Sequence, residues 1–480
     1  MLSGCLGDDD RPVRVLVIGD PGSTFVGGAR LPLAAQTLRA AAVEGLVGFD
    51  QQGRVAPALA DRWIITDDGL SFIFRLRDGT WPGGRPITAE SARAALVDAL
   101  VQQRGQPLGA DLAVIEEVRA MAGRVIEIRL KRQMPDLLQL LAQPELGLSV
   151  GGRGAGPMKS KRANDKDLGL SGVMLSPIAP EDRGLPPEED WNERAQRVEL
   201  AALPAAKAIK LFNAGEAELV LGGSFVDYPR LGEAGVSGGA IRFDQVAGLF
   251  GLAVVHGDGF LAKEENREAI AMAIDRDALI AAVNLSGWVA TTRVINPGLE
   301  GDSGAIGERW IGRGIEDRRT TAAGRVSRYK SGRSGAVTLR IALPSGPGSD
   351  LLFKRLGEDL KAIGLEVRRV PMAADADLRL VDSVARYAQP AWFFNQLSCA
   401  NARALCSASA DTLFAKAQAE LDPAKRVDLL GDAEAQLTVA NSYIPFGVPI
   451  RWSLVSGGVT AFAVNRWGVH PLMPLAMLPK

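Results

Sequence analysis

The chain has 480 residues, and at about 150 residues per domain this length predicts roughly three domain-sized units or two large lobes. Basic and acidic residues nearly balance, with a formal net charge of -1, which argues against nucleic acid as a partner. No apolar run reaches the roughly 18 residues of a transmembrane helix. Hydrophobic residues make up 47% of the chain, enough for large buried cores.

The first part of the chain predicts several strands. The apolar run VRVLVIG, residues 13–19, indicates a buried strand that leads into the loop GDPGST. Alternation on both sides of Asp68-Gly69 predicts a hairpin with an Asp-Gly turn. The stretch VIEIRLKR, residues 125–132, alternates as another strand.

Local signals also predict two helix starts and one long loop. Thr88 is expected to cap a helix, and the charged break at Asp275 is expected to cap another. Residues 151–190 are polar and rich in glycine and proline, which favours a solvated loop. Within them GGRGAG follows no clear strand, so a turn is preferred over a nucleotide-binding loop. Strands alternating with helices along the whole chain predict an α/β protein.

Few residues offer catalytic or metal-binding chemistry. The two histidines, His256 and His470, lie in no metal-binding spacing, and no C-x-x-C pair is present. There is no G-x-S-x-G elbow and no Walker-type phosphate loop. We therefore expect no metal, no cofactor and no catalytic residue. A hydrolase with scattered catalytic residues is the least favoured of the functions considered.

The three cysteines leave two interpretations open. Cys5 stands alone, whereas Cys399 and Cys406 lie close together, so their spacing fits one modified cysteine and one disulfide, or three free thiols. The first residues, MLSGC, resemble a bacterial lipobox, whose cysteine is lipidated, and the polar run GDDD follows as a tether would. The basic and apolar regions of a complete signal peptide do not precede it, so we expect the natural start to differ. Lipidation of Cys5 would place the protein outside the cytoplasm, where a disulfide persists.

Five stretches occur in an order that is typical of one protein family. The first is AAAVEGLVGFDQQGRVAPALADRWIITDDGLSFIFRLRDGTWPGGRPITAESARAAL. GAGPM is similar to the pattern G-T-G-P-Y, NAGEAELVLG to an S-G-E-x-D strand, and NREAIAMAIDRDALI to R-x-A-x-x-x-A-I-D-R-x-x-I. DLRLVDSVARYAQPAWFF is similar to D-L-x-L-x-x-W-x-A-D-Y-x-D-P-x-x-F-L. Together they resemble the extracellular solute-binding proteins of the peptide, dipeptide and nickel type, solute-binding protein family 5, from about Val13 to the C-terminus.

The resemblance implies an α/β, two-lobed periplasmic-binding-protein fold, type II-like, with an extra small subdomain in the N-terminal lobe. We expect a lipobox remnant and tether at 1–10, lobe one at 11–247 with its subdomain at about 35–150, lobe two at 248–455, and a return to lobe one at 456–480. In such folds the lobes close around the ligand by a hinge.

The function implied by the resemblance is that of the substrate-binding component of an ABC importer. Such a protein captures a small solute, peptide-like or other, between its lobes and delivers it to a membrane permease. The expected partners are the ligand and the permease subunits, not nucleic acid, and the protein is expected to be a monomer. It would lie in the periplasm or at the cell surface, anchored through Cys5. The alternative is a sensory or assembly protein that uses the same ligand-closing fold without transport.

The last of the five stretches departs from the family at one position. Peptide-binding members use the Asp of A-D-Y to hold the α-ammonium group of the peptide, and Arg386 stands at that position here. A guanidinium repels an ammonium group but can bind a carboxylate or phosphate with two parallel hydrogen bonds. We therefore hypothesise that the ligand carries an anionic or strongly accepting group. The alternative is that Arg386 faces solvent or pairs with a neighbour such as Asp382.

Other candidate ligand contacts come from the same stretch and from the loop after the first strand. Tyr387 is one, because it has an apolar body and a polar tip. Trp392 is another, although Trp392, Phe393 and Phe394 are expected mainly to anchor a core. In the family the loop after the first strand touches the ligand, which adds three candidates: Asp20, Ser23 and Thr24.

The resemblance also bears on residues outside the ligand site. Some family members have a disulfide just after the last of these stretches, which favours a bond between Cys399 and Cys406. His256 takes the place of an Asn that is common in the family, and we expect a hydrogen-bonded structural role for it. Trp63 and Trp81 fall in the small subdomain and are expected in its core.

Overall fold

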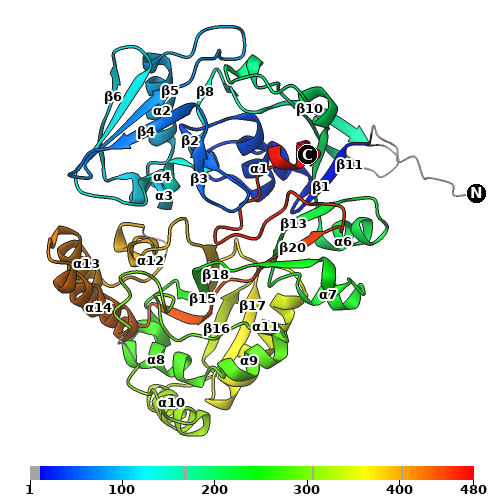
Figure 1. The fold of residues 1–480 in the computed structure, drawn as a ribbon. Coiled ribbons are helices and arrows are strands. Elements are labelled where there is room, and N and C mark those ends of the chain that lie inside the picture. The colour runs from blue at the N-terminus through cyan, green and yellow to red at the C-terminus, as the bar shows by residue number, and fades with distance from the viewer. Residues whose placement is uncertain (1–10, 166–169, 305–307, 402–403, 480) are drawn as a thin grey trace, which may run out of the picture. The chain divides into compact units, whose positions relative to one another are not determined.

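The computed structural model in Figure 1 describes residues 11–165, 170–304, 308–401 and 404–479. By its internal contacts the chain divides into two compact units. Unit 1 consists of the described residues up to Gly223, of Glu233–Gln245 and of the segment from Arg451 onward. Unit 2 consists of Ser224–Gly232 and Val246–Ile450. Each unit has its own central sheet and helices, so the predicted α/β class is confirmed.

The chain passes between the two units at four points. Two of them, 245/246 and 450/451, lie within five residues of the boundaries expected at 247/248 and 455/456. The short segment Ser224–Gly232 was expected in lobe one, whereas its contacts place it in unit 2. The proposed tether at 1–10, including Cys5, lies outside the described residues.

Unit 1 is built on a seven-stranded sheet in the order β10-β11-β12-β1-β13-β20-β14. Its strands are β1 (Val13–Ile18), β10 (Met158–Asp165), β11 (Leu170–Pro177), β12 (Val198–Leu203), β13 (Leu219–Ser224), β14 (Ile241–Asp244) and β20 (Arg451–Val455). β1 is parallel to both of its neighbours and is buried along its middle, which explains why its sequence is apolar throughout. β20, red in Figure 1, comes from the far end of the chain and pairs with β14 in antiparallel fashion.

The prediction of a loop at residues 151–190 is wrong, because this stretch contains the strands β10 and β11. The two strands pair in antiparallel register from Met158–Pro177 to Asp165–Leu170. β10 is the edge strand of the sheet, and its side chains at Lys159, Lys161 and Arg162 are exposed. Charged side chains are common on edge strands because they discourage pairing with other chains. Because these side chains are polar, the composition of the stretch predicted a loop and the strand was missed.

The glycine-rich sequence GGRGAG forms a turn, as predicted. It joins two short antiparallel strands, β8 (Ser149–Val150) and β9 (Arg153–Gly154). Between the strands, Gly151 and Gly152 have φ values of 60° and 76°, the left-handed region that a type I′ hairpin turn requires at both positions.

Unit 1 also contains smaller sheets and six helices among its described residues. A four-stranded sheet has the order β4-β5-β7-β6, with β4 (Ala60–Ile65), β5 (Ser71–Leu76), β6 (Ile115–Met121) and β7 (Val125–Leu130). A further strand pair is β2 (Val47–Phe49) and β3 (Val55–Pro57). The helices are α1 (Leu33–Ala42), α2 (Ala89–Gln102), α3 (Pro107–Leu112), α4 (Leu137–Leu141), α5 (Trp191–Arg194) and α6 (Ala205–Asn213).

Two local predictions in unit 1 are confirmed. The predicted hairpin is β4 and β5, and Gly69 in its turn has a φ of 66°. The helix expected after Thr88 is α2, and the Thr88 hydroxyl accepts a hydrogen bond from the backbone N–H of Ser91 at 3.2 Å. Both features depend on side chains only a few residues apart, which is why the sequence predicts them.

Unit 2 is built on a five-stranded sheet in the order β17-β16-β18-β15-β19. Its strands are β15 (Gly248–Val254), β16 (Thr338–Ala342), β17 (Glu366–Val370), β18 (Leu378–Val384) and β19 (Tyr443–Gly447). Its helices are α8 (Glu264–Ala273), α9 (Arg276–Val283), α10 (Ile315–Lys330), α11 (Pro347–Ala362), α12 (Pro390–Leu397), α13 (Ala408–Ala419) and α14 (Pro423–Ala440). The short helix α7 (Pro229–Glu233) contains the boundary at 232/233.

Short 3-10 turns complete the described secondary structure. They are η1 (Pro21–Phe25), η2 (Pro144–Leu146), η3 (Glu181–Arg183), η4 (Gly238–Ala240), η5 (Gly259–Ala262), η6 (Cys399–Asn401) and η7 (Met473–Ala476). η1 follows β1 after Gly19 and Asp20, and η3 lies in the stretch where a loop was expected.

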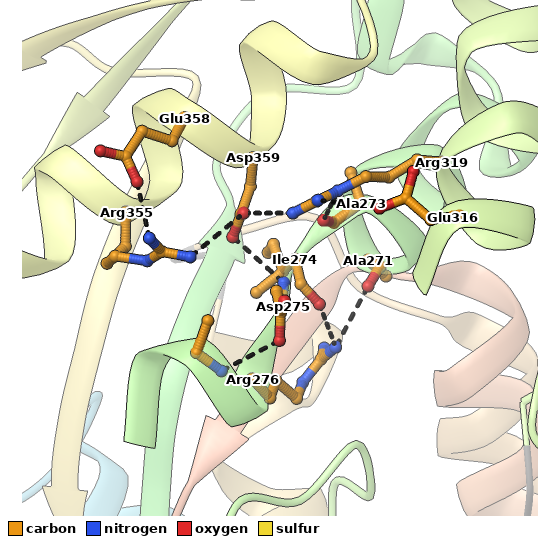
Figure 2. A network of polar contacts seen from close by, with 11 residues as sticks. Ala271, Ala273, Ile274, Asp275, Arg276, Glu316, Arg319, Arg355, Glu358 and Asp359 are labelled. Carbon is orange, nitrogen blue, oxygen red and sulfur yellow. Dashed lines mark hydrogen bonds and ion pairs between the residues drawn. The ribbon is translucent and has the colours of Figure 1, made fainter. Parts of the chain in front are cut away.

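The A-I-D-R motif of unit 2 forms a buried polar network that holds the junction of α8 and α9 (Figure 2). The Asp275 carboxylate accepts a hydrogen bond from the Ala278 N–H at 3.0 Å, which confirms the predicted cap. Arg276 donates to the carbonyls of Ala271 and Pro445, and burial lowers the pKa of Arg276 to about 10. Asp359 accepts from the Asp275 N–H at 3.1 Å. In this structure the motif therefore stabilises the fold.

Candidate functional site

The loop expected to touch ligand begins at the carboxyl end of β1. β1, β12 and β13 are parallel, so their carboxyl ends share one edge of the unit 1 sheet. Ligands of open α/β sheets commonly bind outside this edge. The Gly19 N–H donates to the Leu203 carbonyl at 2.9 Å, which fixes the start of the loop against β12. Asp20 follows as an exposed residue before η1.

Two hydroxyl groups in η1 are buried without a hydrogen-bond partner among the described residues. They are Ser23 Oγ and Thr24 Oγ1, and Thr24 as a whole is 1% exposed. A buried polar group without a partner costs about 1–3 kcal/mol. A partner such as a water molecule would remove this penalty, and the ligand-contact roles of Asp20, Ser23 and Thr24 stay predictions.

The second candidate region follows β18 in unit 2. The backbone N–H of Ala385 donates to the Ala247 carbonyl at 2.8 Å, which continues the pairing of β18 one residue beyond the strand. The chain then turns into α12, with Gln389 as N-cap and Pro390 in the first turn. Proline suits this position because the first helical N–H has no partner within the helix. Sequence reasoning expected aromatic core residues here and did not predict the helix.

The aromatic residues of α12 are core residues, as expected. Trp392, Phe393 and Phe394 are 1%, 0% and 3% exposed. Phe394 stacks on Phe414 of α13, with ring centroids 4.8 Å apart. The Trp392 indole N–H is buried and lacks an acceptor within the described part of the chain, and the ligand-contact role of Trp392 stays a prediction.

Arg386 and Tyr387 lie between β18 and α12. Tyr387 is 1% exposed, and its hydroxyl accepts a hydrogen bond from the Asn395 side chain at 3.4 Å. Arg386 is partly buried and already takes part in a contact within the described structure. The ligand-contact roles of both residues stay predictions.

The disulfide favoured by the resemblance is present in the structure. Cys399 and Cys406 are bonded, with their Cα atoms 5.1 Å apart. The Cys399 N–H also donates to Asp411 of α13 at 2.9 Å, and the Leu405 N–H donates to the Val254 carbonyl at 2.7 Å. The bridged segment is thus tied to α13 and to the end of β15.

Unit 1 contains a cluster of charged residues that sequence reasoning missed. In this Glu44 cluster (Glu44, Arg77 and Arg183), Arg77 donates to Glu44 at 2.7 Å and Arg183 donates to its other carboxylate oxygen at 2.5 Å. Glu44 and Arg77 belong to the E-G-L and F-x-L-R pieces of the resemblance, which is a signal that could have paired them. Arg183 lies 139 residues from Glu44, in the stretch interpreted as a loop, and carried no such signal.

Unit 2 contains a second cluster, the Arg293 cluster (Arg293, Asp302 and Glu434). Arg293 bonds both carboxylates, and its guanidinium lies 2.7 Å from Glu434. Burial would lower the pKa of Arg293, but the two carboxylates raise it above its ordinary value. Burial raises the pKa of Glu434 despite the neighbouring guanidinium. For Asp302 burial acts in the same direction, but the hydrogen bonds from Arg293, Gly304 and Gly298 hold its pKa below the ordinary value.

The structure also places the two histidines. His256 lies 2.8 Å from Asp375, and His470 lies 3.0 Å from Asp244 within unit 1, so each has a carboxylate partner. Within the described ranges no group of three or more His, Cys, Asp or Glu side chains is placed to hold a metal ion. No helix in the same ranges combines the length and apolar character needed to cross a bilayer.

Known proteins match this chain in sequence and in fold. Residues 54–179 match the family model of bacterial extracellular solute-binding proteins, family 5 Middle. The chain is 33% identical over 121 residues to the probable deoxycholate-binding periplasmic protein YgiS of Escherichia coli (strain K12). That match covers 22% of this chain and 23% of YgiS, so it spans about a quarter of the length of that relative.

Solved structures extend the likeness over nearly the whole chain. The Escherichia coli murein tripeptide binding protein MppA has a TM-score of 0.80 at 18% identity, over 98% of both chains. Haemophilus influenzae OppA, in complex with RPPGFSPFR, also has a TM-score of 0.80, at 16% identity, over 96% of this chain and 98% of OppA. The resemblance to the family 5 solute-binding proteins is confirmed. The two-lobed fold expected for family 5 is confirmed as well.

Proposed function

We propose that this chain is the substrate-binding component of an ABC importer, which captures a small solute and delivers it to a membrane permease. The observation that carries the proposal is the combination of the family 5 match at residues 54–179 with a likeness in fold that covers nearly the whole chain. The loop after β1 supports it, because two buried hydroxyls there lack partners among the described residues. Binding a solute needs such polar groups, and it needs no nucleophile or general base.

We further propose that the bound solute carries an anionic group. Arg386 stands where peptide-binding members of family 5 carry an aspartate for the α-ammonium group. A guanidinium at this position favours a carboxylate or phosphate and disfavours a cationic terminus. Among the similar proteins, YgiS is named for deoxycholate, whereas the OppA structure holds a peptide. The anion proposal is therefore separable from the family assignment.

The ligand can be identified by native mass spectrometry of the protein purified from its own host. An organic acid retained by the protein is the expected result. Isothermal titration with that acid should then show binding that is about tenfold weaker in Arg386→Gln, because a hydrogen bond to a charged group contributes about 1.5–3 kcal/mol. Arg368→Gln removes an exposed arginine of β17 in the same unit and should bind as the unchanged protein does.

Two outcomes would contradict the anion proposal while leaving the importer proposal intact. One is recovery of an intact peptide with a free N-terminus. The other is unchanged binding of the retained solute by Arg386→Asp. Failure to retain or bind any solute, together with no loss of uptake in cells that lack the gene, would contradict the importer proposal itself.

A lipid anchor on Cys5 is part of the same proposal, with the protein held in the periplasm or at the cell surface. It rests on the sequence LSGC and the polar residues after it. Intact-mass measurement of the membrane fraction should show a mass increase of diacylglycerol size that is absent in Cys5→Ser. An unmodified N-terminal region in protein from the native host would contradict the anchor.

A further inference from the structure

Unit 1 contains a large cavity beside the glycine-rich turn. The candidate ligand residues that follow β1 and β18 do not line it. Its volume is about 920 Å³, within the range of roughly 300–1,000 Å³ typical of small-molecule sites. The lining comes from the end of α1, the turn after β5, the segment from β9 to β10, and η3. Apolar side chains contribute to it, among them Val43, Pro82 and Ile178.

The walls of this cavity carry more positive than negative charge. Four cationic side chains line it: Arg77, Arg153, Lys159 and Arg183. Asp182 is the acidic side chain in the same lining, and Glu44 contacts two of the cations from behind. Four cations therefore face two carboxylates. Lys159, Arg153 and Asp182 are exposed to solvent. The surplus of positive charge in the less exposed part of the cavity therefore depends on the Glu44 cluster.

Within the Glu44 cluster the two arginines differ in how fully they are bonded. Arg77 donates to the Ala58 carbonyl at 3.1 Å, to the Arg183 carbonyl and to Glu44 at 2.7 Å. Arg183 bonds Glu44, and its Nε is buried without an acceptor among the described residues. One carboxylate thus serves two guanidinium groups, and the Arg183 side chain lines the cavity and is 14% exposed. A partly buried cation that shares its counter-charge is less favourable than a fully paired one, and an anion in the cavity would relieve this.

The glycine-rich turn shapes the cavity and leaves its space open. A Cβ atom at Gly154 would lie 2.4 Å from the Val43 side chain, and one at Gly156 would lie 2.2 Å from the Ala42 backbone. Side chains are therefore excluded where the turn meets the end of α1. The glycines serve this close packing, while the charge for recognition comes from the arginines and Lys159.

We infer that this cavity binds a small organic anion, with its carboxylate or phosphate group against Arg183 and its apolar part against Val43, Pro82 and Ile178. The cavity is too large for an inorganic ion alone, and its mixed lining fits a solute that is charged at one end. The arginine supplies planar paired donors for an oxyanion. This second site lies in unit 1, whereas Arg386 lies in unit 2, so the inference goes beyond the proposed importer ligand.

Three probes of matched apolar length test the inference: hexyl phosphate, hexanoate and hexanol. Titration calorimetry at constant ionic strength should show binding of at least one of the two anions with a Kd below roughly 1 mM, and no binding of hexanol. The preferred anion tells whether phosphate or carboxylate is the natural group. In Arg183→Gln the affinity should fall by at least about tenfold, because a charge-assisted hydrogen bond is lost. Glu44 and Arg77 remain as a neutral pair in this variant, so it should fold.

Exposed variants keep the test decisive even if Arg183→Gln does not fold. Lys159→Gln at the rim should weaken anion binding by about two- to threefold, as expected for a screened surface charge. Arg129→Gln removes an exposed arginine of β7 outside the lining and should change nothing. No anion binding below roughly 10 mM would overturn the inference. So would equal binding by the unchanged protein and Arg183→Gln, or equal binding of hexanol.

The outcome is independent of the proposed importer ligand. Arg386→Gln leaves the cavity in unit 1 intact, so hexyl phosphate and hexanoate should bind this variant as they bind the unchanged protein. A loss of binding in Arg386→Gln with no loss in Arg183→Gln would show that the probes occupy the site proposed for the importer ligand, and would refute the cavity as an anion site.

Discussion

The Glu44 cluster of unit 1 and the Arg293 cluster of unit 2 are both clusters of three charged residues, but their net charges have opposite signs. The Glu44 cluster has two guanidinium groups for one carboxylate, and the Arg293 cluster has two carboxylates for one guanidinium. Glu434 is 1% exposed in its side chain and Glu44 is 9% exposed, so both carboxylates are withdrawn from water.

The surroundings of the two clusters differ in what they supply. In the Arg293 cluster the surplus negative charge is met by backbone donors, since Asp302 accepts from the N–H groups of Gly298 and Gly304 and Glu434 accepts from that of Ile295. In the Glu44 cluster the surplus positive charge borders an open cavity. Each cluster contains an arginine Nε without a partner among the described residues, so an unpaired atom alone does not separate them. The two clusters differ in charge balance and in what surrounds the surplus charge. The Arg293 cluster is closed, because backbone donors meet its surplus charge, and the Glu44 cluster is open, because its surplus charge borders a cavity.

The largest expected effect comes from removing the shared cation of the Arg293 cluster. Arg293→Gln leaves two buried carboxylates without a counter-charge, and we expect a loss of about 3–5 kcal/mol in the free energy of unfolding of unit 2. Hydrogen–deuterium exchange of the amides in β18 and β19 measures this loss specifically in unit 2.

The matched control is Arg309→Gln, because the Arg309 side chain is 61% exposed and its partner Glu268 keeps Arg325. A change of less than about 1 kcal/mol is expected there, as for other exposed ion pairs. Equal effects of Arg293→Gln and Arg309→Gln would mean that the closed cluster does not stabilise unit 2.

A smaller loss is expected from Glu44→Gln in unit 1. It removes the shared carboxylate and leaves Arg77 and Arg183 facing each other, at a cost of about 2–3 kcal/mol, less than in unit 2 because solvent reaches the cavity. Exchange of the amides in β1 and β12 reports this loss.

The open cluster predicts a partial rescue that the closed cluster cannot show. Hexyl phosphate should stabilise Glu44→Gln more than it stabilises the unchanged protein, because the variant has a larger positive surplus at the cavity. Hexyl phosphate should stabilise Arg293→Gln no more than it stabilises the unchanged protein. Rescue of both variants to the same degree would remove the distinction drawn between the clusters.

The smallest expected effect is in the Arg293 cluster, where the contributions of Glu434 and Asp302 to the free energy of unfolding should depend on pH in opposite ways. Because the pKa of Glu434 is raised by folding, its contribution to the free energy of unfolding falls as pH rises from the ordinary Glu value of about 4.3 toward the raised value. The stability advantage of the unchanged protein over Glu434→Gln should therefore be larger near pH 4 than at pH 7. Urea unfolding at both pH values measures it.

Asp302 should show the opposite trend, because its pKa is lowered by folding. Its contribution is present above the ordinary Asp value of about 3.9 and is lost as pH falls below it. The advantage of the unchanged protein over Asp302→Asn should then narrow on acidification. Parallel trends for Glu434→Gln and Asp302→Asn would contradict the opposite pKa shifts of the two carboxylates.

The sequence predicted those parts of the fold that depend on neighbouring residues. The cap at Asp275 and the turn at Gly69 involve groups within three residues of each other, so local chemistry is sufficient. β10 was missed because an edge strand pairs through its backbone and leaves charged side chains in water. α12 was missed because its aromatic residues are buried on adjacent positions and show no helical spacing.

The candidate sites were predicted to different extents for the same reason. The loop after β1 and the position of Arg386 follow from the resemblance, because both lie in recognisable stretches. The cavity in unit 1 depends on contacts between Glu44, Arg77 and Arg183, which come from three separate segments. No periodicity or local motif carries that information, and only the folded unit brings these residues together.

The position of β20 in the unit 1 sheet has a consequence for the order in which the protein can form during synthesis. β20, residues 451–455, stands between β13 and β14, and Leu472, Leu475 and Ala476 fill the same core as β1. Residues near the start of the chain must therefore wait for residues more than 430 positions later, roughly half a minute of translation at about 15 residues per second. The unit 2 sheet also waits for a late strand, because β19 (Tyr443–Gly447) belongs to it, so both sheets should stay incomplete and exposed to chaperones and proteases until synthesis is nearly finished.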